Sequence, residues 1–335
     1  MTNSSPDKSS ILEVDGLTVD YGLKGVSLRA IDNVTFALRA GEAVALVGES
    51  GSGKTTTAMA IAGLLSPNAR VSKGEVRCYG NRLPIENDAA MRPHRWSETS
   101  VVFQGAMNAL NPVHRVIKQI AEPCMLKLGM TRGEATARAR ELLELVGIPA
   151  GRGSAYPHEL SGGMRQRVMI AMALACRPSI IIGDEPTTAL DVITQAQILK
   201  LLGDLRSRLN LALILITHDL SLVAECCDRM MIMYAGRIVE DGTVAEIFAK
   251  PKHPYTRLLI ESIPNPASGK RIIRSIPGDP PNLMNRPSGC AFHPRCPSAM
   301  AVCMTEVPSF DEYGQGRVAC HLHRLTQEDK VAVHA

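Results

Sequence analysis

The strongest constraint on the fold is a glycine-rich stretch that fits the pattern G-x-x-x-x-G-K-[ST], namely Gly48, Glu49, Ser50, Gly51, Ser52, Gly53, Lys54 and Thr55. The short apolar run Ala43–Val47 precedes it, and residues 56–65 after it carry apolar residues at helical spacing without a proline. In this strand–loop–helix order the glycines and the helix N-terminus turn backbone N–H groups toward an anion. The stretch therefore predicts a nucleotide site.

Individual side chains in and near this loop have expected roles. Lys54 supplies a mobile positive charge for the β- and γ-phosphates, and the Thr55 hydroxyl can ligate Mg²⁺. We include the next residue, Thr56, among the nucleotide-binding residues. Tyr21, upstream of the loop, offers an aromatic face on which an adenine ring could stack, although an ordinary strand position is the alternative.

Composition limits the class of protein. A chain of 335 residues with 45% hydrophobic and 21% charged residues is ordinary for a globular protein of one or two domains. Its net charge of +4 gives no reason to expect nucleic-acid binding. No stretch approaches 18 apolar residues, and residues 1–10 are polar, so we expect a flexible N-terminus and a cytosolic protein that reaches a membrane only through partners.

The pattern of apolar residues predicts the elements around the loop. Leu12–Tyr21 and Ile31–Leu38 have apolar residues near period two, which is typical of half-buried strands in an antiparallel sheet, and Gly74–Tyr79 is a further strand. Thr131 begins a helix with a capping box. We interpret residues 105–177, approximately, as a helical subdomain.

Two carboxylates end a buried strand. Ile180–Gly183 is apolar and is followed by Asp184 and Glu185. Acidic side chains at such a place are costly unless they serve an ion or water. Asp184 can hold Mg²⁺, as the acid of phosphate-loop enzymes does, and Glu185 could polarise an attacking water.

Two more polar side chains follow predicted strands. Gln104 comes after Val101–Phe103, and His218 comes after the apolar run 211–216 and Thr217. Because ligands bind at the carboxyl ends of parallel strands in nucleotide-binding folds, His218 becomes a candidate for the site, with a structural histidine as the alternative. A glutamine at a strand end, such as Gln104, is usually a surface residue.

A second helix start resembles a phosphate site. Ser161 is a plausible N-cap before Gly162, Gly163 and Met164, and the two glycines expose backbone N–H groups. A simple loop-to-helix junction is the alternative. One chain with one phosphate loop has no use for a second anion site, whereas a second copy or a homologue would.

Together these motifs resemble the ATP-binding subunits of ABC transporters. The matching residues occur in the family's order over about residues 11–250: the loop 48–55, Gln104, the signature Leu160–Arg167, Asp184-Glu185, the turn Ala189-Leu190-Asp191 and His218. Met164 departs from the pattern, which has glutamine there. The resemblance implies an α/β P-loop NTPase (ABC ATPase) fold with an N-terminal antiparallel β subdomain, a helical subdomain and a C-terminal cysteine-containing extension at 251–335.

The resemblance also implies roles in ATP hydrolysis with Mg²⁺. Tyr21 would stack on the adenine, and Thr55, Gln104 and Asp184 would hold Mg²⁺. Glu185 would polarise the water and His218 would contact the γ-phosphate. The helix start at Ser161, Gly162, Gly163 and Met164 would cap ATP bound to a partner ATPase.

A narrower resemblance points to the oligopeptide/dipeptide importer branch. It rests on the loop GESGSGK, on His253-Pro254-Tyr255-Thr256, on Ile276-Pro277-Gly278 and on Pro294-Arg295-Cys296 after Cys290. The branch implies a heterodimer with a homologous ATPase, two transmembrane permeases and an extracytoplasmic substrate-binding protein, at the cytoplasmic face of the membrane. Residues 106–112 would contact a permease, with plain solvent exposure of this loop as the alternative. Nickel and oligosaccharides are alternative cargoes.

Four of the nine cysteines lie in the extension: Cys290, Cys296, Cys303 and Cys320. Five, six and sixteen residues separate them, without the C-x-x-C pair that structural zinc sites usually carry. The looser spacing, with Pro297 after Cys296, favours a [4Fe–4S] cluster, and the importer branch carries such a cysteine set. Zinc, with His293 or His321 replacing a thiolate, and free thiols are the alternatives.

Two other classes fit less well. Soluble ABC ATPases of translation or DNA repair tend to carry two cassettes or a long coiled coil, whereas this chain has one phosphate loop and no sustained heptads. A redox protein built around the cysteines would leave the nucleotide motifs unexplained.

Overall fold

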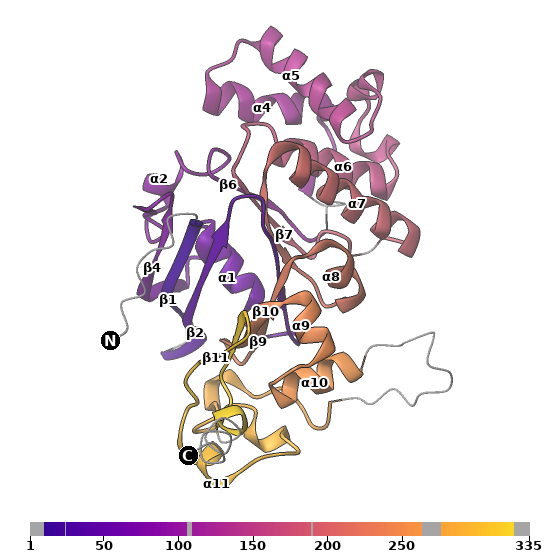
Figure 1. Cartoon of the computed structure of the whole chain (residues 1–335). Helices are drawn as coiled ribbons and strands as arrows, with labels where there is room; N and C mark the ends of the chain where they lie inside the picture. Colours follow the sequence, from indigo (N-terminus) through magenta and orange to yellow (C-terminus); the bar gives the residue numbers. More distant parts are fainter. Residues whose placement is uncertain (1–9, 24, 106–108, 189, 263–275, 325–335) are drawn as a thin grey trace.

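The computed structural model describes residues 10–23, 25–105, 109–188, 190–262 and 276–324. These residues form a four-stranded and an eight-stranded sheet. Figure 1 shows a helical part at one end of the molecule and the C-terminal residues at the other, with both sheets between them. The predicted flexible residues 1–9, the first part of the predicted permease loop and Ala189 lie outside the described residues.

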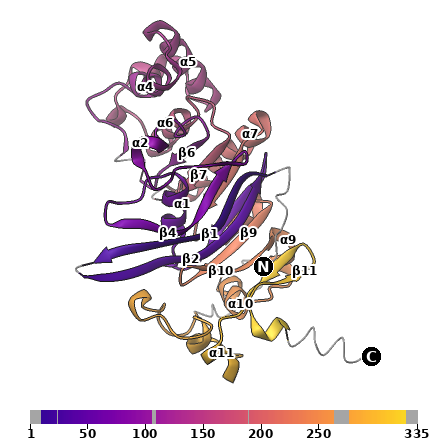
Figure 2. The same cartoon turned by 90° about the vertical axis from the view of Figure 1, so that its left-hand side faces the viewer.

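The smaller sheet is antiparallel, with the order β2-β1-β4-β5; its strands are β1 (Ser10–Leu23), β2 (Val26–Arg39), β4 (Ala69–Cys78) and β5 (Asn81–Arg82). Figure 2 shows its long strands along one side of the molecule. The predicted antiparallel sheet is confirmed. Residue 74, within β4, has to be glycine because a Cβ there would come 2.4 Å from the carbonyl carbon of Gly16 in the neighbouring strand β1.

The larger sheet has the order β11-β12-β10-β9-β3-β8-β7-β6. Its strands are β3 (Ala43–Val47), β6 (Thr99–Val102), β7 (Ile180–Asp184), β8 (Ala212–Ile216), β9 (Arg229–Tyr234), β10 (Arg237–Thr243), β11 (Asp311–Tyr313) and β12 (Gly316–Val318). Strands β6, β7, β8, β3 and β9 run parallel, and β10, β12 and β11 continue the sheet antiparallel. All residues of β3, β7 and β8 are buried, as expected for parallel strands covered on both faces.

The helices are α1 (Lys54–Ile61), α2 (Asp88–Met91), α4 (Val116–Leu128), α5 (Arg132–Leu145), α6 (Gly162–Ala173), α7 (Val192–Leu209), α8 (Leu220–Cys226), α9 (Val244–Ala249), α10 (Pro254–Glu261) and α11 (Ala301–Thr305), with 3₁₀ turns η1 (Ala150–Ser154), η2 (Pro157–Glu159), η4 (Leu283–Asn285) and η5 (His293–Arg295). Within the described residues, no helix has the length and apolar character needed to cross a bilayer.

Helices α4, α5 and α6 make up most of the helical end of the molecule (Figure 1). The predicted capping box at the start of α5 is present: the Glu134 carboxylate accepts the Thr131 N–H at 2.8 Å, and the Thr131 hydroxyl accepts the Glu134 N–H at 3.4 Å. Ala139 and Leu142, on the apolar face of α5, are fully buried in a core shared with α4 and α6.

The C-terminal residues return to the main sheet instead of standing apart. The hairpin β11–β12 pairs with β10 at Glu240 and Asp241. The buried Glu240 carboxylate accepts a hydrogen bond from the Tyr313 hydroxyl at 2.9 Å and from the backbone N–H groups of Lys252 and His253. Glu240 thereby ties two C-terminal segments to the cassette. The boundary at residue 250 stays a prediction.

Burial of His253 makes stability depend on pH. Its side chain caps α10 by accepting the Tyr255 N–H at Nδ1, and burial lowers its pKa from 6.5 to about 3. Because the unfolded chain takes up a proton that the folded chain refuses, stability is lost as the pH falls below 6.5 and toward 3. We expect this histidine to remove about 2 kcal/mol of unfolding free energy between pH 7.5 and 5.

His253→Asn provides the matched comparison, since asparagine also caps helices and carries no titrating group. Guanidinium unfolding at both pH values should show a drop that is about 2 kcal/mol smaller in the variant than in the wild type. Equal drops in the two proteins would contradict the assignment.

Candidate nucleotide-binding site

A cleft of about 740 Å³ opens at the carboxyl edge of the parallel strands. It is lined by Tyr21, Leu28, Ala30, Val47, Gly48, Glu49, Ser50, Gly51, Gly53, Lys54, Thr55, Thr56, Gln104, Glu185, His218, Leu259 and Leu283. The structure thus brings most of the predicted ATP-binding and catalytic residues together around one space, although they come from strands and loops far apart in the sequence.

The phosphate loop connects β3 to α1 in the predicted way. A Cβ on Gly48 would come 2.2 Å from the carbonyl oxygen of Met233, so the loop needs glycine where it passes β9. Gly53 has a φ of 104° at the N-cap of α1, another conformation that favours glycine. These two positions explain both glycines that the pattern requires, Gly48 and Gly53.

Lys54 is held inside the loop. Its ammonium group donates to the carbonyl oxygens of Gly48 at 2.7 Å and Glu49 at 2.9 Å. Burial lowers the pKa of Lys54, while the carboxylates of Glu185, Asp184 and Glu49 act in the opposite direction. A triphosphate would offer this ammonium group stronger, charged acceptors than the two carbonyl groups.

Thr55 and Asp184 meet across the base of the cleft. The Thr55 hydroxyl donates to Oδ1 of Asp184 at 3.1 Å. Asp184 is 5% exposed, and burial raises the pKa of its carboxyl group. A hydroxyl and a buried carboxylate are the oxygen ligands that Mg²⁺ uses beside nucleotide phosphates, so this pair fits that ion.

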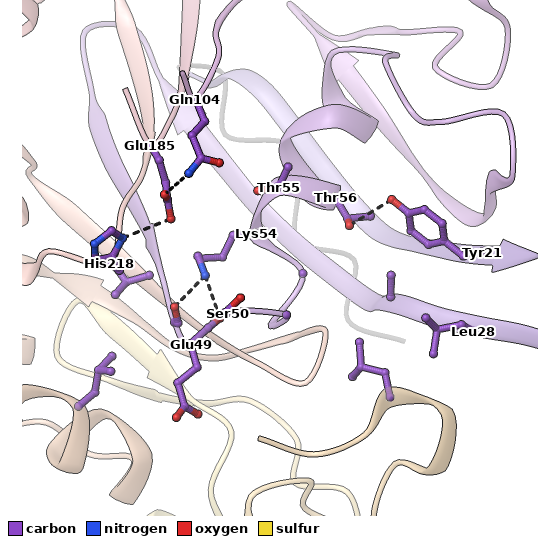
Figure 3. A pocket seen from close by; sticks show the side chains of 17 residues that line it. Tyr21, Leu28, Glu49, Ser50, Lys54, Thr55, Thr56, Gln104, Glu185 and His218 are labelled. Atoms are coloured by element: carbon purple, nitrogen blue, oxygen red, sulfur yellow. Dashed lines mark hydrogen bonds and ion pairs between the residues drawn. The ribbon is translucent and has the colours of Figure 1, made fainter. Parts of the chain in front are cut away.

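Glu185 is the centre of a polar cluster. Its Oε2 accepts hydrogen bonds from Gln104 Nε2 at 2.9 Å and from the Thr188 hydroxyl at 3.0 Å. Its Oε1 lies 3.3 Å from Nδ1 of His218. Figure 3 shows Gln104, Glu185 and His218 converging above Lys54. The backbone of Glu185 has a φ of 45°, which is strained for a residue with a side chain and is the kind of strain found at functional sites.

Tyr21 lies at the other end of the cleft. Its hydroxyl is 3.5 Å from that of Thr56, and its side chain is half-buried at the cleft wall (Figure 3). Tyr21 is a strand residue of β1, as the alternative interpretation expected, and it also lines the cleft. Its contact with adenine stays a prediction.

The signature motif lies elsewhere. Ser161 is the N-cap of α6, and its hydroxyl accepts the Met164 N–H at 3.3 Å. Among these described residues, Ser161, Gly162, Gly163 and Met164 are all absent from the lining of the cleft. The structure therefore does not bring this helix start to the chain's own phosphate loop.

The four cysteines of the extension line one small cavity of about 10 Å³, together with His293 and His321. Burial raises the pKa of Cys290 to about 11, and it also raises the pKa of Cys296 and Cys320. In the part of the chain that the structure describes, however, no three histidine, cysteine or acidic side chains are grouped closely enough to hold a metal ion. The predicted cluster is not supported by this geometry.

Several residues that line or adjoin the cleft were not predicted from the sequence. Leu28 and Ala30 come from β2, Leu259 from α10 and Leu283 from the C-terminal extension. Thr188 donates a hydrogen bond to the Glu185 carboxylate, and its only signal in the sequence is its place shortly after Asp184 and Glu185. Apolar cleft walls leave no motif, so sequence alone offered no signal for them.

The sequence matches two protein families. Residues 31–188 match the ABC transporter family, and residues 239–303 match the oligopeptide/dipeptide transporter C-terminal region. The dipeptide transport ATP-binding protein DppD of Haemophilus influenzae is 45% identical over 93% of this chain and 95% of the relative. The oligopeptide transport ATP-binding protein OppD of Salmonella typhimurium is 44% identical over 95% of this chain and 96% of the relative.

Solved structures of related cassettes share the fold. A dimeric ATP-binding cassette in a post-hydrolysis state, bound to ADP and phosphate, superposes with a TM-score of 0.62 at 28% identity, covering 70% of this chain and 98% of that chain. A bacterial ABC transporter cassette, also dimeric, gives the same TM-score at 29% identity and the same coverage of both chains. The α/β cassette fold expected from the motifs is thereby confirmed.

Proposed function

Because this chain is an ATP-binding subunit of the ABC transporter family, we propose that it hydrolyses ATP to power the import of dipeptides or oligopeptides. The observation that carries the peptide assignment is the match of residues 239–303 to the oligopeptide/dipeptide transporter C-terminal region. The named relatives, which are dipeptide and oligopeptide transport proteins, support it over nearly their whole length.

Binding of ATP uses the loop and the buried acid. Lys54 leaves the two carbonyl oxygens for the β- and γ-phosphates, and backbone N–H groups of the loop take the remaining oxygens. The Thr55 hydroxyl and Asp184 would hold Mg²⁺, which neutralises charge on the phosphates. Tyr21 lies where an aromatic ring could stack on the adenine.

Hydrolysis uses the polar cluster. Glu185 accepts the proton of an attacking water while Gln104 and Thr188 hold its carboxylate in place. His218 contacts the other oxygen of that carboxylate and would contact the γ-phosphate when ATP is bound. In this arrangement the acid is oriented by three neighbours before ATP arrives.

A second ATPase completes the site. The helix start at Ser161–Gly163 lies outside the lining of this chain's own cleft and offers the backbone N–H groups of a helix N-terminus, so it suits an ATP held by a homologous partner. The apolar side chains of Val192 and Ile193, 80% and 72% exposed, follow the Leu190–Asp191 turn and would be covered in such a pair. Two cassettes that share two ATP molecules would close when ATP binds and open after hydrolysis.

The remaining partners are two transmembrane permeases and an extracytoplasmic substrate-binding protein. We place the chain at the cytoplasmic face of the membrane, held there through the permeases. The segment 106–112, which follows Gln104, would carry the state of the site to a permease; its first three residues lie outside the described residues.

Peptide import is tested in an auxotroph from which this chain has been removed. We expect growth on the required amino acid supplied free, but no growth when it is supplied as a dipeptide or tripeptide. The wild-type chain should restore growth on peptides, and Glu185→Gln should not. If the strain without this chain still grows fully on peptides but no longer takes up nickel or an oligosaccharide, that solute would be the imported cargo instead.

We retain a [4Fe–4S] cluster at Cys290, Cys296, Cys303 and Cys320 as a proposal about the extension. The support is that four thiols from separate segments line one cavity, and thiolates are the usual ligands of such clusters. The thiols would have to move to ligate a metal, because their present grouping does not hold one.

Anaerobic purification decides this question. Iron and labile sulfide in equal amounts, with visible absorbance that Cys296→Ser removes, are the expected results. Bound zinc without sulfide would favour the alternative metal, and protein without metal in which Cys290, Cys296, Cys303 and Cys320 are free thiols would end the cluster proposal.

A further inference from the structure

Arg295 joins the C-terminal extension to the phosphate loop. Its Nη1 donates to Oε2 of Glu49 at 2.7 Å, and its Nη2 donates to Oε1 at 3.0 Å, a bidentate pair between residues 246 apart in sequence. The side chain of Arg295 is 6% exposed and that of Glu49 is 23% exposed. Buried, bidentate pairs of this kind have fixed geometry, unlike most pairs on a protein surface.

Backbone carbonyl groups of the extension also fix the guanidinium group of Arg295. Its Nε donates to the carbonyl oxygen of Pro277 at 2.8 Å, and Nη2 donates to that of Gly278 at 3.0 Å. It also lies over the ring of Tyr234, 5.9 Å from the centroid. Arg295 therefore reaches Glu49 from a position that the extension determines.

A second contact fixes the backbone of the same loop residue. The Glu49 N–H donates to the hydroxyl of Tyr255 at 2.9 Å, and the Glu49 carbonyl accepts the ammonium group of Lys54 at 2.9 Å. In Figure 3 the Glu49 side chain points away from Lys54 and Glu185. Glu49 thus connects the extension on one side with the phosphate-binding lysine on the other.

The charge of Glu49 makes this connection matter for ATP. A carboxylate in a loop that surrounds a triphosphate repels it across a few ångströms. Arg295 compensates that charge and holds the Glu49 carboxylate on the side of the loop that faces away from Lys54. The extension further contributes Leu283 to the cleft wall, so it already forms part of the site.

We propose that Arg295 is a positioning residue for nucleotide binding: through Glu49 it neutralises and orients the phosphate loop, which makes the C-terminal extension a working part of the ATP site. The proposal rests on the proposed function only in that the ligand is a nucleoside triphosphate. Arg295 touches no reacting atom, so its loss should weaken binding without removing the chemistry.

The test measures ATP affinity on the full chain. Arg295→Gln leaves the Glu49 carboxylate uncompensated, and we expect the Kd for MgATP and for a non-hydrolysable analogue to rise about tenfold, with KM rising in parallel. The kcat at saturating ATP should stay within about twofold of wild type. Arg295→Lys keeps the positive charge but loses the bidentate geometry, so its Kd for MgATP should lie between those of the wild type and Arg295→Gln.

A double variant separates charge from contact. Glu49→Gln in the Arg295→Gln background removes the uncompensated carboxylate, and we expect most of the lost affinity to return. Arg286→Gln is the matched control, because Arg286 also ties the extension to the cassette, through Asp32 at 3.0 Å, without touching the phosphate loop. Its affinity for ATP should stay at the wild-type value.

Three outcomes would overturn the proposal: wild-type affinity in Arg295→Gln, an equal loss in Arg286→Gln, or no recovery in the double variant. The melting temperature of each variant shows whether it is folded under the conditions of the binding assay, and only folded variants are compared. Failure of the wild-type chain to bind ATP would instead refute the proposed function, because these measurements need neither permease nor peptide.

Discussion

Glu185→Gln should reduce ATP turnover by about 10²- to 10⁴-fold while leaving ATP bound. Glutamine has the shape of glutamate and can still bond with Gln104 and Thr188, so the cleft should keep its form. It cannot take a proton from water at neutral pH, and only that step is lost. ATP should therefore accumulate in the bound, unhydrolysed state, in which paired cassettes become long-lived enough to detect by size-exclusion chromatography.

The measurement is phosphate release at saturating MgATP, beside equilibrium binding of ATP. Glu141→Gln is the matched control, because Glu141 is an exposed acid on α5 that pairs only with Arg138 at 3.2 Å in the described structure. It should hydrolyse ATP at the wild-type rate. Turnover near wild type in Glu185→Gln would remove Glu185 from the role of base.

Ser161→Asp should abolish ATP-dependent pairing and lower the turnover of the pair roughly 100-fold or more. Aspartate caps helices as well as serine does, so α6 should keep its N-terminus. Its negative charge would, however, face the γ-phosphate held by the partner. Two such charges about 4 Å apart near a protein surface repel by about 4 kcal/mol.

Ser161→Asn isolates the charge, since asparagine also caps the helix and is neutral. It should keep pairing and most of the turnover. In both variants the chain's own phosphate loop is untouched, so the affinity of the isolated chain for ATP should not change. Equal pairing in the aspartate and asparagine variants would mean that α6 faces no phosphate, and the shared-site proposal would fail.

Much of the cassette was predictable because its signals are local. The phosphate loop follows a wholly apolar strand, β3, and a capping box marks α5 within four residues. The acid pair at the end of β7 and the histidine after β8 needed one further rule, that parallel strands present their carboxyl ends at one edge. That rule placed Glu185 beside His218, as the 3.3 Å contact shows.

The extension was predicted less well because its order comes from distant contacts. Strands β11 and β12 have three residues each, too few to show a period, and only β12 pairs with β10, at the distant residues Glu240 and Asp241. The Arg295–Glu49 pair spans 246 residues. The sequence does indicate that a cation should lie near the acidic Glu49, because this residue is part of a phosphate-binding loop. Nothing in the sequence indicates which arginine supplies that charge.

The β11–β12 hairpin also changes the edge of the main sheet, because the outermost strand is the three-residue β11 and not the seven-residue β10. At Glu240 and Asp241, β12 forms backbone hydrogen bonds with β10, which would otherwise be an exposed edge strand. Exposed margins recruit strands from other molecules and seed aggregates. A chain cut after residue 250 would therefore lose more than the extension's cysteines, because it would also expose the edge of β10. We expect such a chain to aggregate more readily than the full chain, as light scattering would measure.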